Sequence, residues 1–346
     1  MKFKHFSLLA FYIWAQSATN FVAAQPHSQS PAQAINATPP VAESKSINDW
    51  LLRLHELSKR RSYIGTYVVS SGGQMHSAKI WHACEGAQQI ERVESLTGAP
   101  RSTFRHNEKV VTFMPEQKIA RSEKRGVSGT FPELVQSADN RIAEFYKLKA
   151  EGVERIAGLE ADVVMLIPKD NLRFGYRVWT EQKKGLIVKL QTLNADGRVL
   201  EQAAFSELQL DAPVRMDKLL QMMGKVDGYR VEESALVKTT ASAEGWQQMV
   251  PVAGFKPMSC YKRPTAGTSS TATGNEPIQW LFSDGLASVS LFVEPFDRLK
   301  HAKESTMSMG ATHTFTRQLG SYWLTAMGEV PMNTLKQFAT GLERKK

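Results

Sequence analysis

Three residues in one short stretch, His76, His82 and Cys84, come nearest to a metal-binding cluster. Imidazole nitrogen and thiolate sulfur are the ligands that zinc prefers, and residues two apart on a strand point to the same face. His82 and Cys84 are such a pair, but a zinc site needs three or four protein ligands, and no third or fourth ligand is apparent beside them. We therefore predict no metal site and interpret these residues as strand positions in polar surroundings.

The catalytic and cofactor-binding motifs that can be recognised by spacing are absent from the chain. It contains no HExxH, no GxxxxGK[ST], no GxGxxG after a strand and no GxSxG. Carboxylates are plentiful but scattered, and no pair stands out as an acid/base couple. These observations favour a binding or regulatory protein without a cofactor over an enzyme.

The remaining residues with reactive chemistry are the two cysteines, Cys84 and Cys260. An oxidising compartment would permit a disulfide between them, which would tie two distant parts of the chain together. Free cysteines are also commonly buried as small apolar groups. The sequence leaves both alternatives open.

Residues 1–24 have the features of a signal peptide. Lys2 and Lys4 precede a short apolar run, and small residues end at Ala24, where we expect cleavage. The run is too short to span a bilayer, and no later stretch is long and apolar enough for a membrane helix. We therefore expect an exported protein.

The mature chain is predicted to begin with a tether and to carry a positive charge. Residues 25–45 are rich in Pro, Ser, Gln and Ala and cannot bury enough apolar surface to order themselves. The formal charge of the full chain is +9, and removing residues 1–24 leaves +7. Such an excess favours acidic partners such as lipid phosphates or an acidic peptide, and export argues against nucleic acid.

The folded part is predicted to begin with a helix and to continue as an antiparallel sheet. Apolar residues recur at helical spacing from Ile47 to Leu57. Between residues 63 and 208, aromatic and β-branched runs alternate with short turns, and strands joined by short turns must be antiparallel. We assign 46–212 to a first domain and allow that its curved sheet either is filled by the helix or leaves an apolar cavity.

The pattern changes after residue 212. Pro213, Gly224 and Gly228 interrupt a partly helical run, so we interpret 213–240 as a linker and 241–346 as a second domain. Met222 and Met223 in the linker are either adaptable contact residues or core fillers, and methionine is more often a filler.

A hairpin is predicted at residues 279–293, QWLFSDGLASVSLFV, because two apolar runs flank Ser283-Asp284-Gly285. This string resembles the corresponding segment of the MucB/RseB family. Residues 174–179 (FGYRVW) and 196–202 (DGRVLEQ) are similar to the family's Tyr-x-x-Trp and DGxxLEQ strands, and 97–101 (TGAPR) is similar to its Asp-Gly-Pro-Arg stretch. The likeness extends over nearly the whole mature chain.

The resemblance implies an α+β protein with two domains. The first would be a large, unclosed antiparallel β-barrel with helices, like the lipoprotein carriers LolA and LolB, and the second a smaller α/β domain. It also implies a periplasmic negative regulator of the sigma-E stress response. Such a regulator binds the periplasmic domain of the anti-sigma factor RseA/MucA, shields it from site-1 proteolysis, and is released by lipopolysaccharide or mislocalised lipoprotein.

Two sets of residues are candidates for these contacts. The candidates for lining or supporting a lipid site are Tyr67, Trp81, Val163, Met165, Tyr176, Val178 and Trp179, although for any one of them a place in the core is the favoured interpretation. The domain junction and residues 241–346 are expected to supply much of the anti-sigma-binding surface, and the candidate residues for it are Asp284, Gly285, Met222 and Met223. A lipoprotein carrier or chaperone of the LolA type is the alternative function, and a homo-oligomer is an open alternative for assembly.

Overall fold

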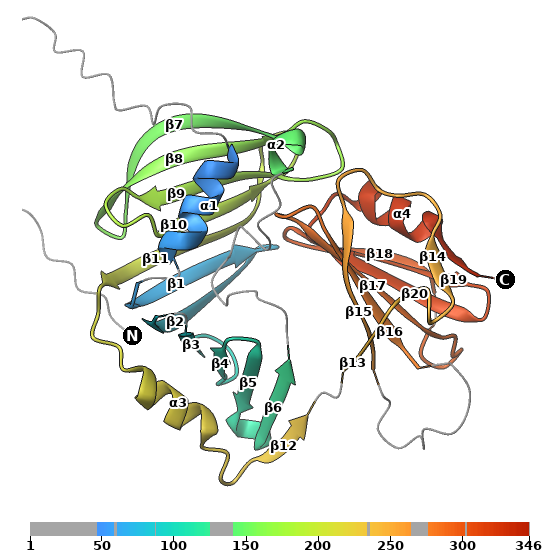
Figure 1. Cartoon of the computed structure of the whole chain (residues 1–346), viewed down its shortest axis with the longest axis horizontal. Coiled ribbons are helices and arrows are strands. Elements are labelled where there is room, and N and C mark those ends of the chain that lie inside the picture. Colours follow the sequence, from blue (N-terminus) through green and yellow to red (C-terminus); the bar gives the residue numbers. More distant parts are fainter. Residues whose placement is uncertain are drawn as a thin grey trace, which may run out of the picture. The chain divides into compact units, whose positions relative to one another are not determined.

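The computed structural model describes residues 47–58, 61–86, 88–124, 141–233, 236–263, 276–301 and 303–345, and they belong to one compact unit of the chain (Figure 1). The predicted signal peptide and tether lie outside the described residues. Among the described helices, none combines the length and apolar character that a membrane span requires.

The first sheet has twelve strands in the order β12-β6-β5-β4-β3-β2-β1-β11-β10-β9-β8-β7. Within the sheet, each pair of adjacent strands among β1 to β11 is antiparallel, which confirms the predicted meander. Strand β12 pairs with β6 in parallel. The sheet does not close, because β12 and β7 remain as its two ends. Its strands are β1 (Tyr63–Ser71), β2 (Gln74–Glu85), β3 (Gln88–Ser95), β4 (Ser102–His106), β5 (Lys109–Met114), β6 (Ile119–Lys124), β7 (Tyr146–Ile156), β8 (Leu159–Pro168), β9 (Gly175–Glu181), β10 (Ile187–Leu193), β11 (Val199–Leu210) and β12 (Arg230–Glu233).

Two helices cover different parts of this sheet (Figure 1). The predicted first helix is α1 (Ile47–Ser58), and its buried residues Ile47 and Leu51 pack with side chains of β8, β9 and β10. The other helix, α3 (Met216–Gly224), packs on β2 to β6 through an apolar face that includes Met216 and Leu219. Shorter helical turns are η1 (Pro115–Gln117) and α2 (Ile142–Phe145).

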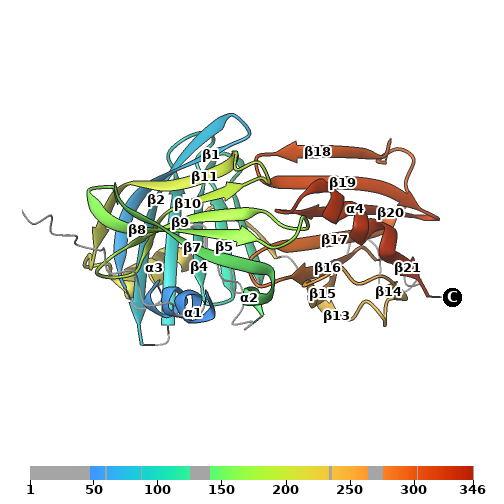
Figure 2. The same ribbon diagram turned by 90° about the horizontal axis from the view of Figure 1, so that it is seen from above.

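The second domain is a seven-stranded antiparallel sheet in the order β13-β15-β16-β17-β20-β19-β18. Helix α4 (Met332–Gly341) packs against β19 and β20 (Figure 2), and a two-stranded ribbon joins β14 to β21. The strands are β13 (Val237–Thr239), β14 (Trp246–Gln248), β15 (Lys256–Lys262), β16 (Ile278–Ser283), β17 (Ser288–Pro295), β18 (Ser305–Met309), β19 (Thr312–Leu319), β20 (Tyr322–Gly328) and β21 (Leu342–Arg344). The predicted α+β class with a smaller second domain is confirmed.

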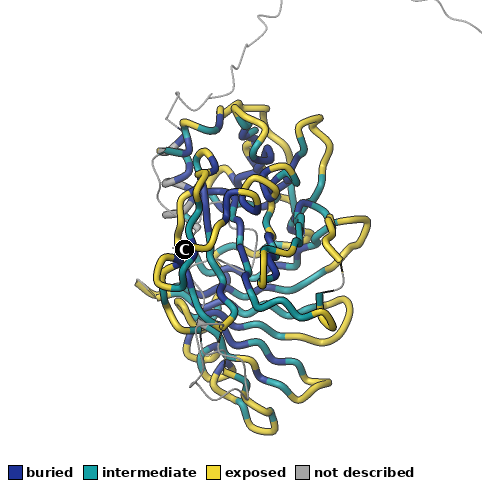
Figure 3. Tube along the Cα trace, turned by 90° about the vertical axis from the view of Figure 1, so that its right-hand side faces the viewer, coloured by how far each residue is buried: buried dark blue, intermediate teal, exposed yellow. Residues whose placement is uncertain are grey.

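The structure differs from the sequence interpretation between the domains. The segment 213–240 contains α3 and β12, which belong to the first domain's layers, because its apolar residues pack on β2 to β6. The last helix ends at Gly341, where the chain turns into β21. Buried residues run along the strands, and many of the chain's turns are exposed (Figure 3), whereas the turn between β16 and β17 is buried.

Candidate functional site

The tip of the β16–β17 hairpin is the tight turn that its sequence predicts. Asp284 Oδ1 accepts hydrogen bonds from the backbone N–H groups of Leu286 at 2.9 Å and Ala287 at 2.7 Å. Ser283 Oγ donates to the carbonyl of Ala287 at 2.9 Å and accepts from the N–H of Gly285, whose φ is 101°. Only glycine adopts that φ easily, so this turn is dictated locally.

The second carboxylate oxygen of Asp284 faces Arg173, which lies in the connection from β8 to β9 of the first domain. Arg173 Nη1 is 3.3 Å from Asp284 Oδ2, and both side chains are 0% exposed. The guanidinium also lies 3.1 Å from the carboxylate of Asp170 and donates to the carbonyl of Ala253 at 2.6 Å. Burial raises the pKa of Asp284, while Arg173 and the backbone donors act in the opposite direction. The two domains therefore share a buried ion pair.

Aromatic and apolar groups enclose this ion pair. The Arg173 guanidinium stands over the ring of Phe145 at 4.3 Å and that of Phe255 at 5.3 Å. A Cβ atom on Gly254 would come within 2.9 Å of the guanidinium. Leu286, next to the turn, is buried in the core cluster of the first domain together with α1. The hairpin tip is thus an anchor between the domains.

This arrangement shows where the partner-surface candidates lie. Asp284 and Gly285 are buried, so a partner cannot reach them while the hairpin is docked. Met223 is buried on the face of α3 that packs on the first sheet, as a core filler would be. Met222 is 40% exposed on the other side of the same helix.

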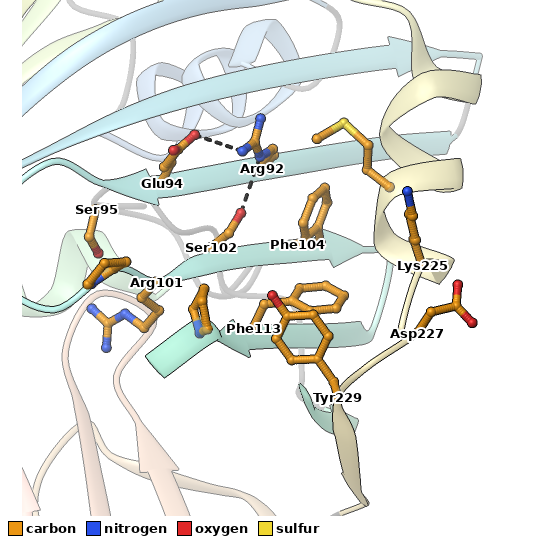
Figure 4. Close-up of a pocket in the computed structure, with 13 residues that line it drawn as sticks. Arg92, Glu94, Ser95, Arg101, Ser102, Phe104, Phe113, Lys225, Asp227 and Tyr229 are labelled. Carbon is orange, nitrogen blue, oxygen red and sulfur yellow. Dashed lines mark hydrogen bonds and ion pairs between the residues drawn. The ribbon is translucent and has the colours of Figure 1, made fainter. Parts of the chain in front are cut away.

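A pocket of about 430 Å³ opens beside α3, where Met222 lies (Figure 4). Phe104 of β4, Phe113 of β5 and Tyr229 form its apolar floor, with the rings of Phe113 and Tyr229 5.1 Å apart. A pocket of this size, floored by aromatic rings, suits an apolar chain.

Charged groups line the mouth of the α3 pocket. Arg92 donates to Glu94 at 2.7 Å and to Ser102 at 3.2 Å, which holds its guanidinium in place. Arg101 and Lys225 are exposed on the lining (Figure 4). The exposed carboxylate of Asp227 is also on the lining, and Arg92 is paired with Glu94, so the positive excess at the rim is small. An apolar floor with a slight excess of cations at its rim fits an amphiphile that has an anionic headgroup.

The lipid-site candidates do not line this pocket. Five of them are buried core residues: Tyr67, Val163, Tyr176, Val178 and Trp179. Met165 is half-buried on β8, and Trp81 lies beside the pocket, with the Arg92 guanidinium 4.6 Å from its ring. The sequence interpretation missed Phe104, Phe113 and Tyr229. The alternation of apolar and polar residues along β4 and β5 could have indicated that Phe104 and Phe113 face inward. No local sequence pattern indicates that Tyr229 lies beside them.

Two family models together match almost all of the folded chain. The MucB/RseB N-terminal domain matches residues 46–223, and the MucB/RseB C-terminal domain matches residues 240–343. The chain belongs to the MucB/RseB family. The boundary between the two matches falls after α3, in agreement with the packing of that helix on the first sheet.

Individual family members are similar over most of their length. The sigma factor AlgU regulatory protein MucB of Pseudomonas aeruginosa is 27% identical, with 88% of this chain and 92% of that protein covered. The sigma-E factor regulatory protein RseB of Haemophilus influenzae is 22% identical, with 86% and 90% covered. A crystal structure of MucB in complex with MucA(peri) superposes with a TM-score of 0.65 at 24% identity, with 87% of this chain and all of that chain covered. It shares the two-domain fold.

In this MucB/RseB family member, the residues first considered as metal ligands have other contacts. His82 is buried, its Nδ1 lies 2.7 Å from the carbonyl of Arg61, and its ring stacks on Tyr63 at 4.9 Å. His76 is exposed on β2. No group of three or more His, Cys, Asp or Glu residues in the described part of the chain is arranged to hold a metal ion.

Both cysteines of this family member are free, in different sheets, so the disulfide that the sequence left open is not formed. Burial, with a smaller contribution from Glu244, raises the pKa of Cys260 to about 11. Because the thiolate is the reacting form, about one Cys260 in a thousand would be reactive at pH 8. Cys84 is half-buried, with Sγ 4.0 Å from Ser62 Oγ.

We therefore expect a thiol reagent at pH 8 to label Cys84 in the native protein much faster than Cys260. Peptide mass spectrometry after a timed reaction with iodoacetamide measures the two rates, and guanidinium-unfolded protein, in which both sites should react equally, is the control. Mature protein that shows no reactive thiol after unfolding without reductant would contradict the free cysteines.

Proposed function

We propose that this chain is a periplasmic negative regulator of a sigma-E-type envelope stress response. It binds the periplasmic domain of an RseA/MucA-type anti-sigma factor and shields that domain from site-1 proteolysis. The observation that carries the proposal is the match of both family domains over the folded chain. The structure of MucB with MucA(peri) supports it, since the two folds correspond.

Release by a lipid-like signal completes the proposed mechanism. A ligand can shift the complex toward dissociation only if it binds the free regulator more tightly than the complexed one. We place this ligand, lipopolysaccharide or the acyl chains of a mislocalised lipoprotein, in the α3 pocket. Its aromatic floor would take acyl chains, and Arg101 and Lys225 would meet phosphate groups.

The direct test measures binding of residues 25–346 to the periplasmic domain of the anti-sigma factor from the same organism. Isothermal titration calorimetry should give a saturable complex, and lipopolysaccharide should weaken it. Protection of the anti-sigma factor from its site-1 protease is the functional readout. A complete absence of binding would reject the proposed function, and binding without protection would reject the shielding.

A pull-down of envelope proteins with the mature chain separates this function from that of a lipoprotein carrier. A regulator should recover the anti-sigma factor. A carrier should recover acylated lipoproteins and transfer them to a second acceptor, and recovery of lipoproteins alone would favour that alternative.

Removing the two rim cations should weaken lipopolysaccharide binding. A basic residue near anionic lipid contributes about 1 kcal/mol, so the double variant Arg101→Gln, Lys225→Gln should lose about thirty-fold in affinity. The control variant Lys147→Gln, Lys336→Gln carries the same charge change at exposed positions away from the pocket lining. Equal losses in both variants, measured by fluorescence titration, would exclude the α3 pocket.

A further inference from the structure

The second domain contains a groove of about 660 Å³, which lies within the size range of ligand pockets. Its floor is formed mainly by aromatic rings. These rings come from β14, β16, α4 and the loop before β15, and they belong to Trp246, Phe255, Trp280, Phe282 and Phe338. The strand β15 contributes Met258 and the buried Cys260.

An exposed methionine stands on the lining of this second-domain groove. Met258, on its lining, is 49% exposed. Val237, Met249 and Val250 are not lining residues; they are next to lining residues in the sequence and are 49%, 53% and 66% exposed. Methionine adapts its shape to a partner, so Met258 suits a contact at the edge of the aromatic floor.

The charges on the groove lining have one sign. Lys238 and Lys345 are exposed on the lining, and Asp and Glu do not occur among its residues. Glu244, which is nearby, is paired with Lys262 at 3.4 Å and accepts from Thr239 at 2.6 Å. The mouth therefore complements acidic groups.

One wall of the groove is also an edge of the sheet. β13 pairs with β15 on one side and is the end strand of the seven-stranded order. A terminal strand can accept an added extended segment by main-chain hydrogen bonding. Val252 and Phe255, also on the lining, flank Ala253, whose carbonyl accepts a hydrogen bond from Arg173 of the first domain.

We infer that this groove docks an extended segment of the anti-sigma factor in which a large apolar anchor is flanked by acidic residues. The anchor enters between the aromatic rings, the flanking carboxylates meet Lys238 and Lys345, and the backbone runs beside β13. This inference rests on the proposed function and specifies the surface that carries it.

Substitution at the groove mouth tests the inference. Met258→Glu places a carboxylate among the apolar contacts and close to the acidic flanks, so its affinity for the anti-sigma periplasmic domain should fall at least tenfold. Met307→Glu makes the same change on β18, at the opposite end of the sheet order, where the side chain is 67% exposed. That control should bind within twofold of wild type, and unchanged circular dichroism of both variants would confirm their folds.

The outcomes distinguish the groove from the proposed function. Wild-type protein that binds while Met258→Glu binds equally well would overturn the groove and leave the function standing. Wild-type protein that does not bind would overturn both. A photo-cross-linker at position 258 should capture an apolar peptide with neighbouring Asp or Glu. A cross-linked peptide that is basic or lacks an apolar anchor would also overturn the inference.

Discussion

Replacing Asp284 with Ala should lower the free energy of unfolding by about 3–5 kcal/mol, the usual cost of removing one partner from a buried ion pair. Among the described residues, the change leaves the Arg173 guanidinium, 0% exposed, with only the carboxylate of Asp170 as an ion-pair partner. It also removes the oxygen that accepts the N–H groups of Leu286 and Ala287. Guanidinium chloride unfolding followed by circular dichroism measures the loss.

Two further variants separate the ion pair from the turn. Asp284→Asn retains an oxygen that can accept both turn hydrogen bonds, so it should fall between wild type and Asp284→Ala. Asp170→Asn is the matched control. The Asp170 side chain is 30% exposed, and screening of its charge by water should limit the loss to about 1 kcal/mol. If Asp170→Asn and Asp284→Ala lower the free energy of unfolding by the same amount, Asp284 is not the main stabilising residue of the contact between the domains.

Replacing Phe338 with Ala should cost about 3–5 kcal/mol and also weaken partner binding. Phe338 is 1% exposed, and its ring packs 5.5 Å from Phe255 and 4.9 Å from Phe282. All three rings line the second-domain groove, so the cavity left by the substitution removes part of its floor. Denaturant unfolding and calorimetric titration with the anti-sigma domain measure the two effects.

Phe292→Ala is the matched control for this prediction. Phe292 is half-buried on β17, is absent from the groove lining, and has the Arg263 guanidinium 5.5 Å from its ring. Its truncation should destabilise the protein less and leave the affinity of correctly folded protein unchanged. If Phe338→Ala loses stability without losing affinity, the ring supports the core but not the docking floor.

Features set by short-range interactions were predictable. The helical spacing of apolar residues from Ile47 to Leu57 predicted α1, because only one face of that helix is apolar. Short turns between the runs of 63–208 predicted an antiparallel sheet, because parallel strands need long crossovers. Family likeness at 174–179 and 196–202 agrees with the match of both domain models.

Features that depend on distant residues were not predictable. Pro213 and two glycines suggested a linker, but α3 is bounded by these residues and packs on the first sheet through Met216 and Leu219. Proline and glycine mark where an element ends, and they carry no information about which surface it covers. The aromatic lipid-site candidates Tyr67, Tyr176 and Trp179 are buried in the core, because both faces of the central strands are covered and the rings pack there.

The turn Ser283-Asp284-Gly285 shows both what the local sequence determines and what only the tertiary structure determines. Its sequence alone determined a tight turn, because the φ of Gly285 and the hydrogen bonds of Asp284 Oδ1 involve only neighbouring residues. Only the tertiary structure decided that the other oxygen of Asp284 meets Arg173 rather than solvent or a partner. Likewise, it alone assembled the α3 pocket and the second-domain groove, because their walls come from segments far apart in the chain.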